Sequence, residues 1–129
     1  MNRIKRIIND QQKTILIIDD EPEIRNLMEE ILSEEGYKTL SAESAQKAEH
    51  IISTHQVDLV YLDIWMPGTD GVDLLKKWTK TNNPKAPIIM ISGHATIKTA
   101  VEATRLGAFD FIEKPLSIEK LLTSAEKAL

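Results

Sequence analysis

The chain has 129 residues, of which 42% are hydrophobic and 28% charged, and its formal net charge is −4. This length and composition are typical of one folded domain and too apolar for an intrinsically disordered protein. The absence of cysteine excludes disulfides, thiolate metal sites and thiol nucleophiles. No apolar run approaches the roughly 20 residues of a membrane span and no secretory signal is recognisable, so we expect a cytoplasmic protein.

Charge divides the chain into a short basic start and an acidic remainder. Residues 1–13 hold four basic side chains and one acid, a sum of +3, which leaves −7 for residues 14–129. We interpret residues 1–13 as a frayed or loosely docked leader and residues 14–129 as the folded domain. Such an acidic body is a poor nucleic-acid binder by bulk charge.

Apolar runs and helical patterns alternate five times along the chain. Short continuous runs rich in β-branched residues are typical of strands covered on both faces in a parallel sheet. These strands are expected at residues 14–19, 37–41, 57–63, 87–91 and 109–113. Repeated βα units favour an α/β fold, a doubly wound five-stranded parallel sheet with five helices on its two faces.

A helical pattern follows each strand. The first helix should begin at Pro22, which suits a first turn, and end at Gly36. The other helices are expected over residues 44–54, from 72 onward, over 95–106 and over 117–129. Predicted inward-facing residues include Leu27, Met28 and Leu32 in the first helix, and Ile118 and Leu121 in the last. Pro67, Gly68 and Gly71 indicate a turn before the third helix.

Polar side chains lie at the carboxyl ends of four predicted strands. Asp19 and Asp20 follow the first strand, Asp63 ends the third, Ser92 follows the fourth and Lys114 the fifth. In an open parallel sheet, ligands bind beyond these ends, where the strand order reverses. The flavodoxin-like order 2-1-3-4-5 makes the first and third strands neighbours, which would bring the three carboxylates into one pocket.

Three crowded carboxylates favour a bound cation, because two like charges ~4 Å apart cost on the order of 4 kcal/mol at an effective dielectric of ~20. Ligands that are all oxygen suit Mg²⁺. A hydroxyl at Ser92 and an ammonium at Lys114 complete the equipment for phosphoryl transfer. A carboxylate can attack phosphorus without a base at pH 7, so the central Asp63 is the candidate acceptor.

Simpler and rival interpretations also exist. A single acid at a strand end is usually a turn or capping residue, and we prefer that interpretation for Glu21 and Asp70. A haloacid-dehalogenase-type phosphohydrolase would carry a second acid two residues after its nucleophile, but Trp65 stands two residues after Asp63. A flavodoxin-like FMN-binding module would need a phosphate loop after the first strand, where the acidic residues of this chain would repel a phosphate.

Over residues 14–129 the sequence resembles the CheY-like receiver domain of two-component response regulators. The segments IIDDEP, LDIWMPGTDG, ISGHA and FIEKP recur in the family's order and spacing. The stretch SGHATIKTAVEATRLGAFDFIEKPL is similar to receivers of the NtrC group, and of NtrX in particular. In that group the receiver precedes an ATPase acting on sigma-54 RNA polymerase and a DNA-binding domain, of which these 129 residues carry no motif. We therefore expect either an excised receiver or a stand-alone receiver in a phosphorelay.

The resemblance implies a role for each acid of the cluster. The residue that matches Asp63 is phosphorylated by a sensor histidine kinase. The match to Asp20 binds Mg²⁺ directly, and the match to Asp19 assists, largely through water. Trp65 stands where the family supplies a backbone carbonyl to the metal. The family is a signalling switch, so we expect only self-phosphorylation and autodephosphorylation as intrinsic activities.

Further roles follow from the same resemblance. Ser92 matches the hydroxyl that contacts the phosphoryl group, Lys114 the lysine that pairs with it, and Phe111 the aromatic switch position. The bond before Pro115 is cis in the family. Bulky residues such as His94, at the variable positions of the site, would shield the phosphoryl group from water. The face formed by the fourth helix, fifth strand and fifth helix is expected to respond to phosphorylation and to support a weak homodimer, with no nucleic acid or membrane bound by the chain itself.

Overall fold

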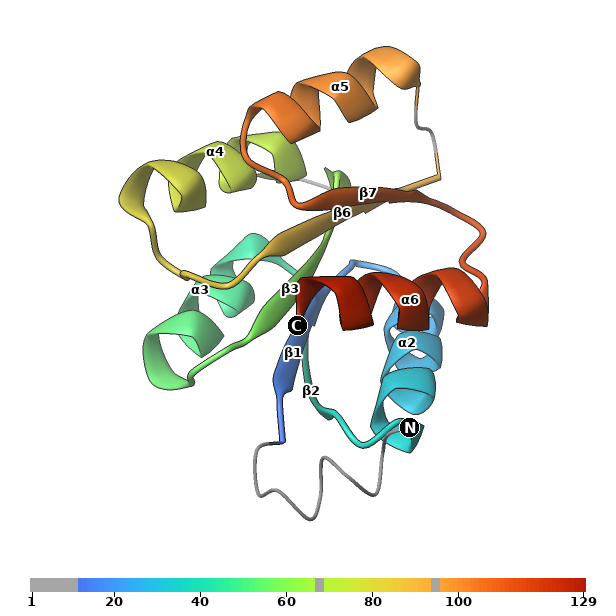
Figure 1. The fold of residues 1–129 in the computed structure, drawn as a ribbon. Coiled ribbons are helices and arrows are strands. Elements are labelled where there is room, and N and C mark those ends of the chain that lie inside the picture. Colours follow the sequence, from blue (N-terminus) through green and yellow to red (C-terminus); the bar gives the residue numbers. More distant parts are fainter. Residues whose placement is uncertain (1–11, 67–68, 94–95) are drawn as a thin grey trace.

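The computed structural model describes residues 12–66, 69–93 and 96–129 and contains a five-stranded parallel sheet (Figure 1). Its strands are β1 (Thr14–Ile18), β2 (Lys38–Ala42), β3 (Leu59–Asp63), β6 (Ile88–Ser92) and β7 (Asp110–Glu113). They lie in the order β2-β1-β3-β6-β7, and every neighbouring pair is parallel. The predicted flavodoxin-like order 2-1-3-4-5 is therefore confirmed.

Five helices in the described ranges cover the two faces of the sheet. They are α2 (Pro22–Glu34), α3 (Ala45–Thr54), α4 (Gly71–Thr81), α5 (Ile97–Arg105) and α6 (Ile118–Ala128). Helices α2 and α6 lie on one face, and α3, α4 and α5 on the other (Figure 1). None of these helices combines the length and the apolarity that crossing a membrane requires.

Side-chain capping defines where three of the helices begin. The side chains of Ser44, Thr96 and Ser117 each accept a hydrogen bond from the backbone N–H three residues further on. This contact satisfies one of the N–H groups that the first helical turn leaves without a partner. Gly36 and Gly107 follow α2 and α5 with φ angles of 96° and 112°, a left-handed conformation that favours glycine at a helix end.

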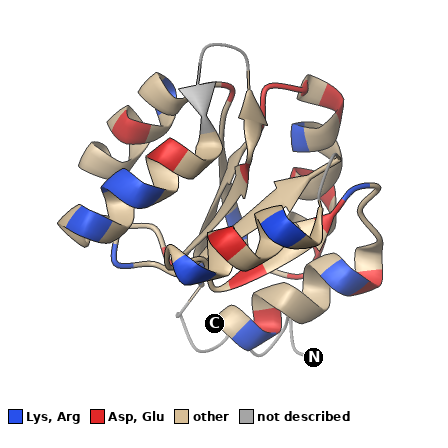
Figure 2. Cartoon of the chain, turned by 90° about the horizontal axis from the view of Figure 1, so that it is seen from above, with Lys and Arg blue, Asp and Glu red and all other residues tan. Residues whose placement is uncertain are grey.

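The core consists of two apolar layers, one on each side of the sheet. In β1, Ile15 and Ile17 face the layer beneath α2 and α6, whereas Leu16 and Ile18 face the layer beneath α3, α4 and α5. The residues of β3 and β6 alternate between the two layers in the same way. Figure 2 shows the charged residues mainly on helices and loops. Burial on both faces explains why the strands read as continuous apolar runs.

The structure differs from the sequence-based expectations at two kinds of position. Between β3 and α4 the structure contains two short strands that the sequence did not predict, β4 (Trp65–Met66) and β5 (Thr69–Asp70), which pair antiparallel. Leu27 and Ile118 were expected to face inward and are 42% and 59% exposed. Each helix contacts only one side of the sheet, so apolar residues at the margin of its inward face, such as Leu27 and Ile118, remain exposed.

Some expectations concern residues outside the described set. These are the turn residues Pro67 and Gly68, the shielding residue His94, and the leader apart from residues 12 and 13. The side chain of Asp70, for which a capping role was expected, also lies outside that set.

Candidate functional site

Three carboxylates converge at the carboxyl ends of β1 and β3. The two strands are direct neighbours, with Ile18 opposite Leu62, so the residues that follow Ile18 lie beside Asp63. One carboxylate oxygen each from Asp19, Asp20 and Asp63 can be chosen so that all three lie within 4.8 Å of one another. Asp19 is 0% and Asp63 is 3% exposed. The structure thus brings together the three acids that the sequence placed at one edge of the sheet.

Local hydrogen bonds hold the acidic turn after β1. The backbone N–H of Asp19 donates to the Ala42 carbonyl at 3.1 Å, and the Glu21 N–H donates to Asp19 Oδ1 at 2.9 Å. From the first turn of α2, Arg25 Nη1 donates to the Asp19 carbonyl at 2.7 Å. The sequence reasoning missed Arg25, although a base one helical turn into α2 is a signal for such a contact. These bonds fix one oxygen of Asp19 and direct the other toward the pocket.

Lys114 places a positive charge among the acids. Its Nζ lies 2.9 Å from Asp19 Oδ2, 2.9 Å from Glu21 Oε1 and 3.6 Å from Asp63 Oδ2. Glu21 does stand at the N-cap position of α2, but no capping hydrogen bond to its side chain is found in the described residues. The capping interpretation of Glu21 was therefore wrong, because its carboxylate is held by a lysine 93 positions away. Burial opposes the charge of Lys114, yet hydrogen bonds to Asp19 and Glu21 raise its pKa overall.

Asp63 lies in an environment that opposes its own charge. Burial first, and then the charge of Asp19, raise the pKa of Asp63 to about 6, although Lys114 acts in the opposite direction. The Trp65 N–H donates to Asp63 Oδ1 at a long 3.4 Å. Without a metal, the pocket therefore holds more negative charge than its lysine compensates.

The donor set fits a hard divalent cation. All its side-chain ligands are carboxylate oxygens, which Mg²⁺ prefers. Asp19 Oδ2 is buried, and the partner found for it among the described residues is the Lys114 ammonium, at 2.9 Å. A buried anionic oxygen in that state is expected to gain from a second cation.

Ser92 and Lys114 are joined by the pairing of the last two strands. Ser92 ends β6 and is fully buried. Its carbonyl accepts a hydrogen bond from the Lys114 N–H at 2.8 Å, which fixes the two residues side by side. The bond between Lys114 and Pro115 is cis, as the resemblance implied.

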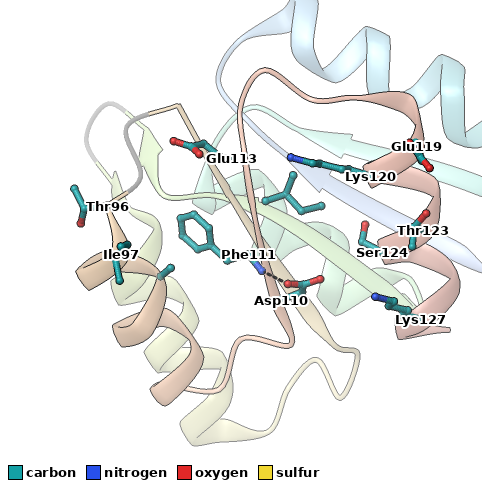
Figure 3. Close-up of a pocket in the computed structure, with 12 residues that line it drawn as sticks. Thr96, Ile97, Asp110, Phe111, Glu113, Glu119, Lys120, Thr123, Ser124 and Lys127 are labelled. Atoms are coloured by element: carbon teal, nitrogen blue, oxygen red, sulfur yellow. Dashed lines mark hydrogen bonds between the residues drawn. The ribbon is translucent and has the colours of Figure 1, made fainter.

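Phe111 lies on β7 in a groove between α5 and α6 (Figure 3). Its backbone N–H donates to Asp110 Oδ1 at 2.7 Å. The groove has a volume of about 760 Å³. Residues from all three elements line it, including Ile97, Ala100, Glu113, Lys120 and Lys127. The aromatic side chain expected to act as a switch is thus partly buried and borders an open groove.

Trp65 lies at the rim of the site, in β4. Its side chain is 55% exposed, and its backbone is tied to Asp63 by the N–H contact and to β5 by the pairing with Asp70. The tryptophan therefore stands next to the acceptor with its indole largely open to solvent.

Comparison with known proteins identifies the family. The sequence model of the response regulator receiver domain matches residues 15–126. The nitrogen assimilation regulatory protein NtrX of Azorhizobium caulinodans is 45% identical over 117 residues, which are 89% of this chain and 26% of that protein. The crystal structure of the receiver domain of NtrX from Brucella abortus matches with a TM-score of 0.83 and 48% identity, and covers 89% of this chain and 97% of that chain.

A further solved structure shows the same fold in an activated state. The solution structure of the beryllofluoride-activated NtrC4 receiver domain dimer matches with a TM-score of 0.84 and 38% identity, over 91% of this chain and 96% of that chain.

The chain spans about a quarter of the length of the curated relatives it matches. Receiver domains are signalling switches with an acidic Mg²⁺-binding pocket. The matched residues and these relatives show that this chain belongs to the response regulator receiver domain family, with NtrX and NtrX-like regulators among its relatives.

Proposed function

We propose that this chain is a receiver that a sensor histidine kinase phosphorylates on Asp63 in the presence of Mg²⁺. The observation that carries the proposal is the convergence of Asp19, Asp20 and Asp63 with Lys114 at the carboxyl ends of the strands. We propose residues 14–129 as the receiver domain and residues 1–13 as its leader. Since sensor kinases take their phosphoryl group from ATP, we place the exchange in the cytoplasm.

The metal ligands would be the carboxylates of Asp19, Asp20 and Asp63 and the backbone carbonyl of Trp65. When bound, Mg²⁺ neutralises negative charge on the oxygens of the transferring phosphoryl group. The all-oxygen donors and the buried Asp19 Oδ2 support this assignment. Arg25 and the Glu21 N–H keep the acidic turn in place through their contacts with Asp19.

In the transfer step, a carboxylate oxygen of Asp63 attacks phosphorus. A P–O bond forms, the P–N bond of the donor phosphohistidine breaks, and the imidazole leaves with the bonding electron pair and takes up a proton. Asp63 needs no base because its carboxylate is mostly ionised at pH 7, above its pKa of about 6. Lys114, 3.6 Å from Asp63 Oδ2, is placed to pair with the phosphoryl oxygens.

For the output, we propose that Ser92 moves toward the phosphoryl group and that Phe111 repacks. The backbone hydrogen bond at the end of β6 joins Ser92 to Lys114, and Phe111 lies on β7, three residues before Lys114. The groove beside Phe111 gives the aromatic ring space to move. The surface of α5, β7 and α6 would then change and support a weak homodimer.

The regulated protein is proposed to be an NtrC/NtrX-type sigma-54-dependent transcription activator. The support is the identity of 45% to the A. caulinodans protein and of 48% to the B. abortus receiver. A further relative, the regulatory protein AtoC of Escherichia coli, is 35% identical over 115 residues.

The test is the intact mass of the chain after incubation with acetyl phosphate, with and without Mg²⁺. We expect one phosphoryl group on the wild type, only with Mg²⁺, and none on Asp63→Asn. Asp73→Asn is the matched control, because it removes an exposed acid of α4 and should label like the wild type. Equal labelling of Asp63→Asn and the wild type would refute the assignment.

A further inference from the structure

The first residue of α4 comes very close to the backbone that carries Asp63. The Gly71 N–H donates to the Ile64 carbonyl at 2.8 Å. A methyl group at Gly71 would overlap the Asp63 carbonyl oxygen and would lie 2.8 Å from Ile64 Cα and 3.0 Å from the Ile64 carbonyl oxygen. All three contacts are with backbone atoms, so rotation of a side chain cannot relieve them.

The surroundings decide which part would yield to such a methyl group. Helix α4 is anchored by Leu74, Leu75 and Trp78, all of which are buried in the core. On the other side, the Ile64 side chain is fully buried, and its N–H donates to the Ile91 carbonyl of β6 at 3.0 Å. Neither the helix nor the side chain of Ile64 can retreat freely, so the displacement would fall on the peptide that follows Asp63.

We propose that Gly71 is a positioning residue of the phosphoryl-acceptor site. Its missing side chain lets α4 hold the end of β3 so that Asp63, and the backbone of Trp65 behind it, keep their place relative to Asp19 and Asp20. Mg²⁺ demands near-ideal octahedral geometry, and functional groups must be held within about 0.5 Å of their productive positions. This inference rests on the proposed function, because it concerns the same metal and acceptor site.

Two other glycines provide matched controls for Gly71→Ala. At Gly107, φ is +112° and a methyl group would lie 2.9 Å from the Thr79 side chain, so alanine there strains the fold at the helix end after α5. At Gly93, next to Ser92, the atoms of the described residues that a methyl group would meet are Lys114 Cβ and Cδ at 3.8 Å, an ordinary contact. The first control tests general destabilisation, and the second tests an added methyl group near the site.

The experiment measures Mg²⁺ affinity of the full chain by calorimetry, unfolding in EDTA, and the acetyl phosphate labelling rate at saturating Mg²⁺. For Gly71→Ala we expect Mg²⁺ binding at least about tenfold weaker and labelling slower by about tenfold to a hundredfold, because small displacements of reacting groups are costly. Gly107→Ala should unfold more easily but, once folded, bind Mg²⁺ within about twofold of the wild type. Gly93→Ala should also bind within about twofold.

If Gly71→Ala binds Mg²⁺ and is labelled like the wild type, the inference is overturned. It is also overturned if the losses of Mg²⁺ binding and of labelling rate are only as large as the unfolded fraction of the variant explains. If Gly71→Ala is unfolded in buffer, all four proteins are measured again in trimethylamine N-oxide, which favours compact states. Failure to fold even there would also overturn the positioning role, because Gly71 would then serve the fold alone. Wild type that neither binds Mg²⁺ nor accepts a phosphoryl group would instead refute the proposed function.

Discussion

The substitution Asp63→Asn should stabilise the metal-free protein, although it removes the proposed acceptor. Asp63 is 3% exposed, and burial together with the Asp19 charge raises its pKa from 3.8 to about 6. At 1.36 kcal/mol per pKa unit, this corresponds to about 3 kcal/mol by which the ionised carboxylate is disfavoured in the folded state. Asparagine has nearly the same shape and no charge, so it removes that cost.

The pH dependence follows from the same linkage. Unfolded Asp63 ionises near its ordinary pKa and folded Asp63 near 6, so the folded state binds more protons between these values. The wild type therefore loses stability as the pH rises through this window, and Asp63→Asn does not. The advantage of the variant should be about 3 kcal/mol at pH 7.5 and about 1 kcal/mol at pH 4.5.

Urea unfolding in EDTA at the two pH values measures this difference. For a domain of this size, the advantage at pH 7.5 corresponds to a Tm about 10 °C higher. Asp73→Asn, which removes an exposed acid, should differ little from the wild type at either pH. Asp63→Asn that is less stable in EDTA at pH 7.5, or whose advantage does not depend on pH, would refute the reasoning.

Three further predictions concern the metal and the switch. Asp20→Ala should weaken Mg²⁺ binding severely while raising or preserving stability in EDTA, because it relieves repulsion among crowded carboxylates. Thermal melts with EDTA and with excess Mg²⁺ measure both effects, and destabilisation in EDTA would indicate a structural role for Asp20. Mg²⁺ should change the tryptophan fluorescence of the wild type but not of Trp65→Phe, since Trp65 borders the acceptor whereas Trp78 is buried in α4. If the Mg²⁺-dependent fluorescence change is lost in Trp78→Phe instead, the prediction is contradicted. Beryllofluoride should shift the backbone NMR signals of Phe111 and α5, and shifts confined to the loops around the acceptor would argue against the proposed switch.

The sequence predicted the fold and the acidic cluster because both depend on strong patterns. Continuous apolar runs predict the strands, and the rule that ligands bind beyond the carboxyl ends of parallel strands predicts that Asp19, Asp20 and Asp63 lie together. The confirmed strand order makes β1 and β3 neighbours, which is the geometric condition for that cluster.

The contacts that the sequence did not predict are long-range or depend on exact backbone geometry. Glu21 reads locally as a helix-capping residue, and only the folded sheet brings Lys114 to it. Helical spacing groups Ile118 with the buried Leu121, but Ile118 is the first residue of α6 and is 59% exposed. Gly71 was predicted as a turn residue, but its close approach to the Asp63 carbonyl follows from how α4 docks against β3.

The site of phosphorylation is the most direct test of the central claim. After incubation with acetyl phosphate and Mg²⁺, borohydride reduces an aspartyl phosphate to homoserine, and peptide mass spectrometry locates the altered residue. The account predicts homoserine at position 63 and at no other aspartate. Homoserine at Asp19 or Asp20, or a stable phosphate on a hydroxyl side chain instead, would contradict it.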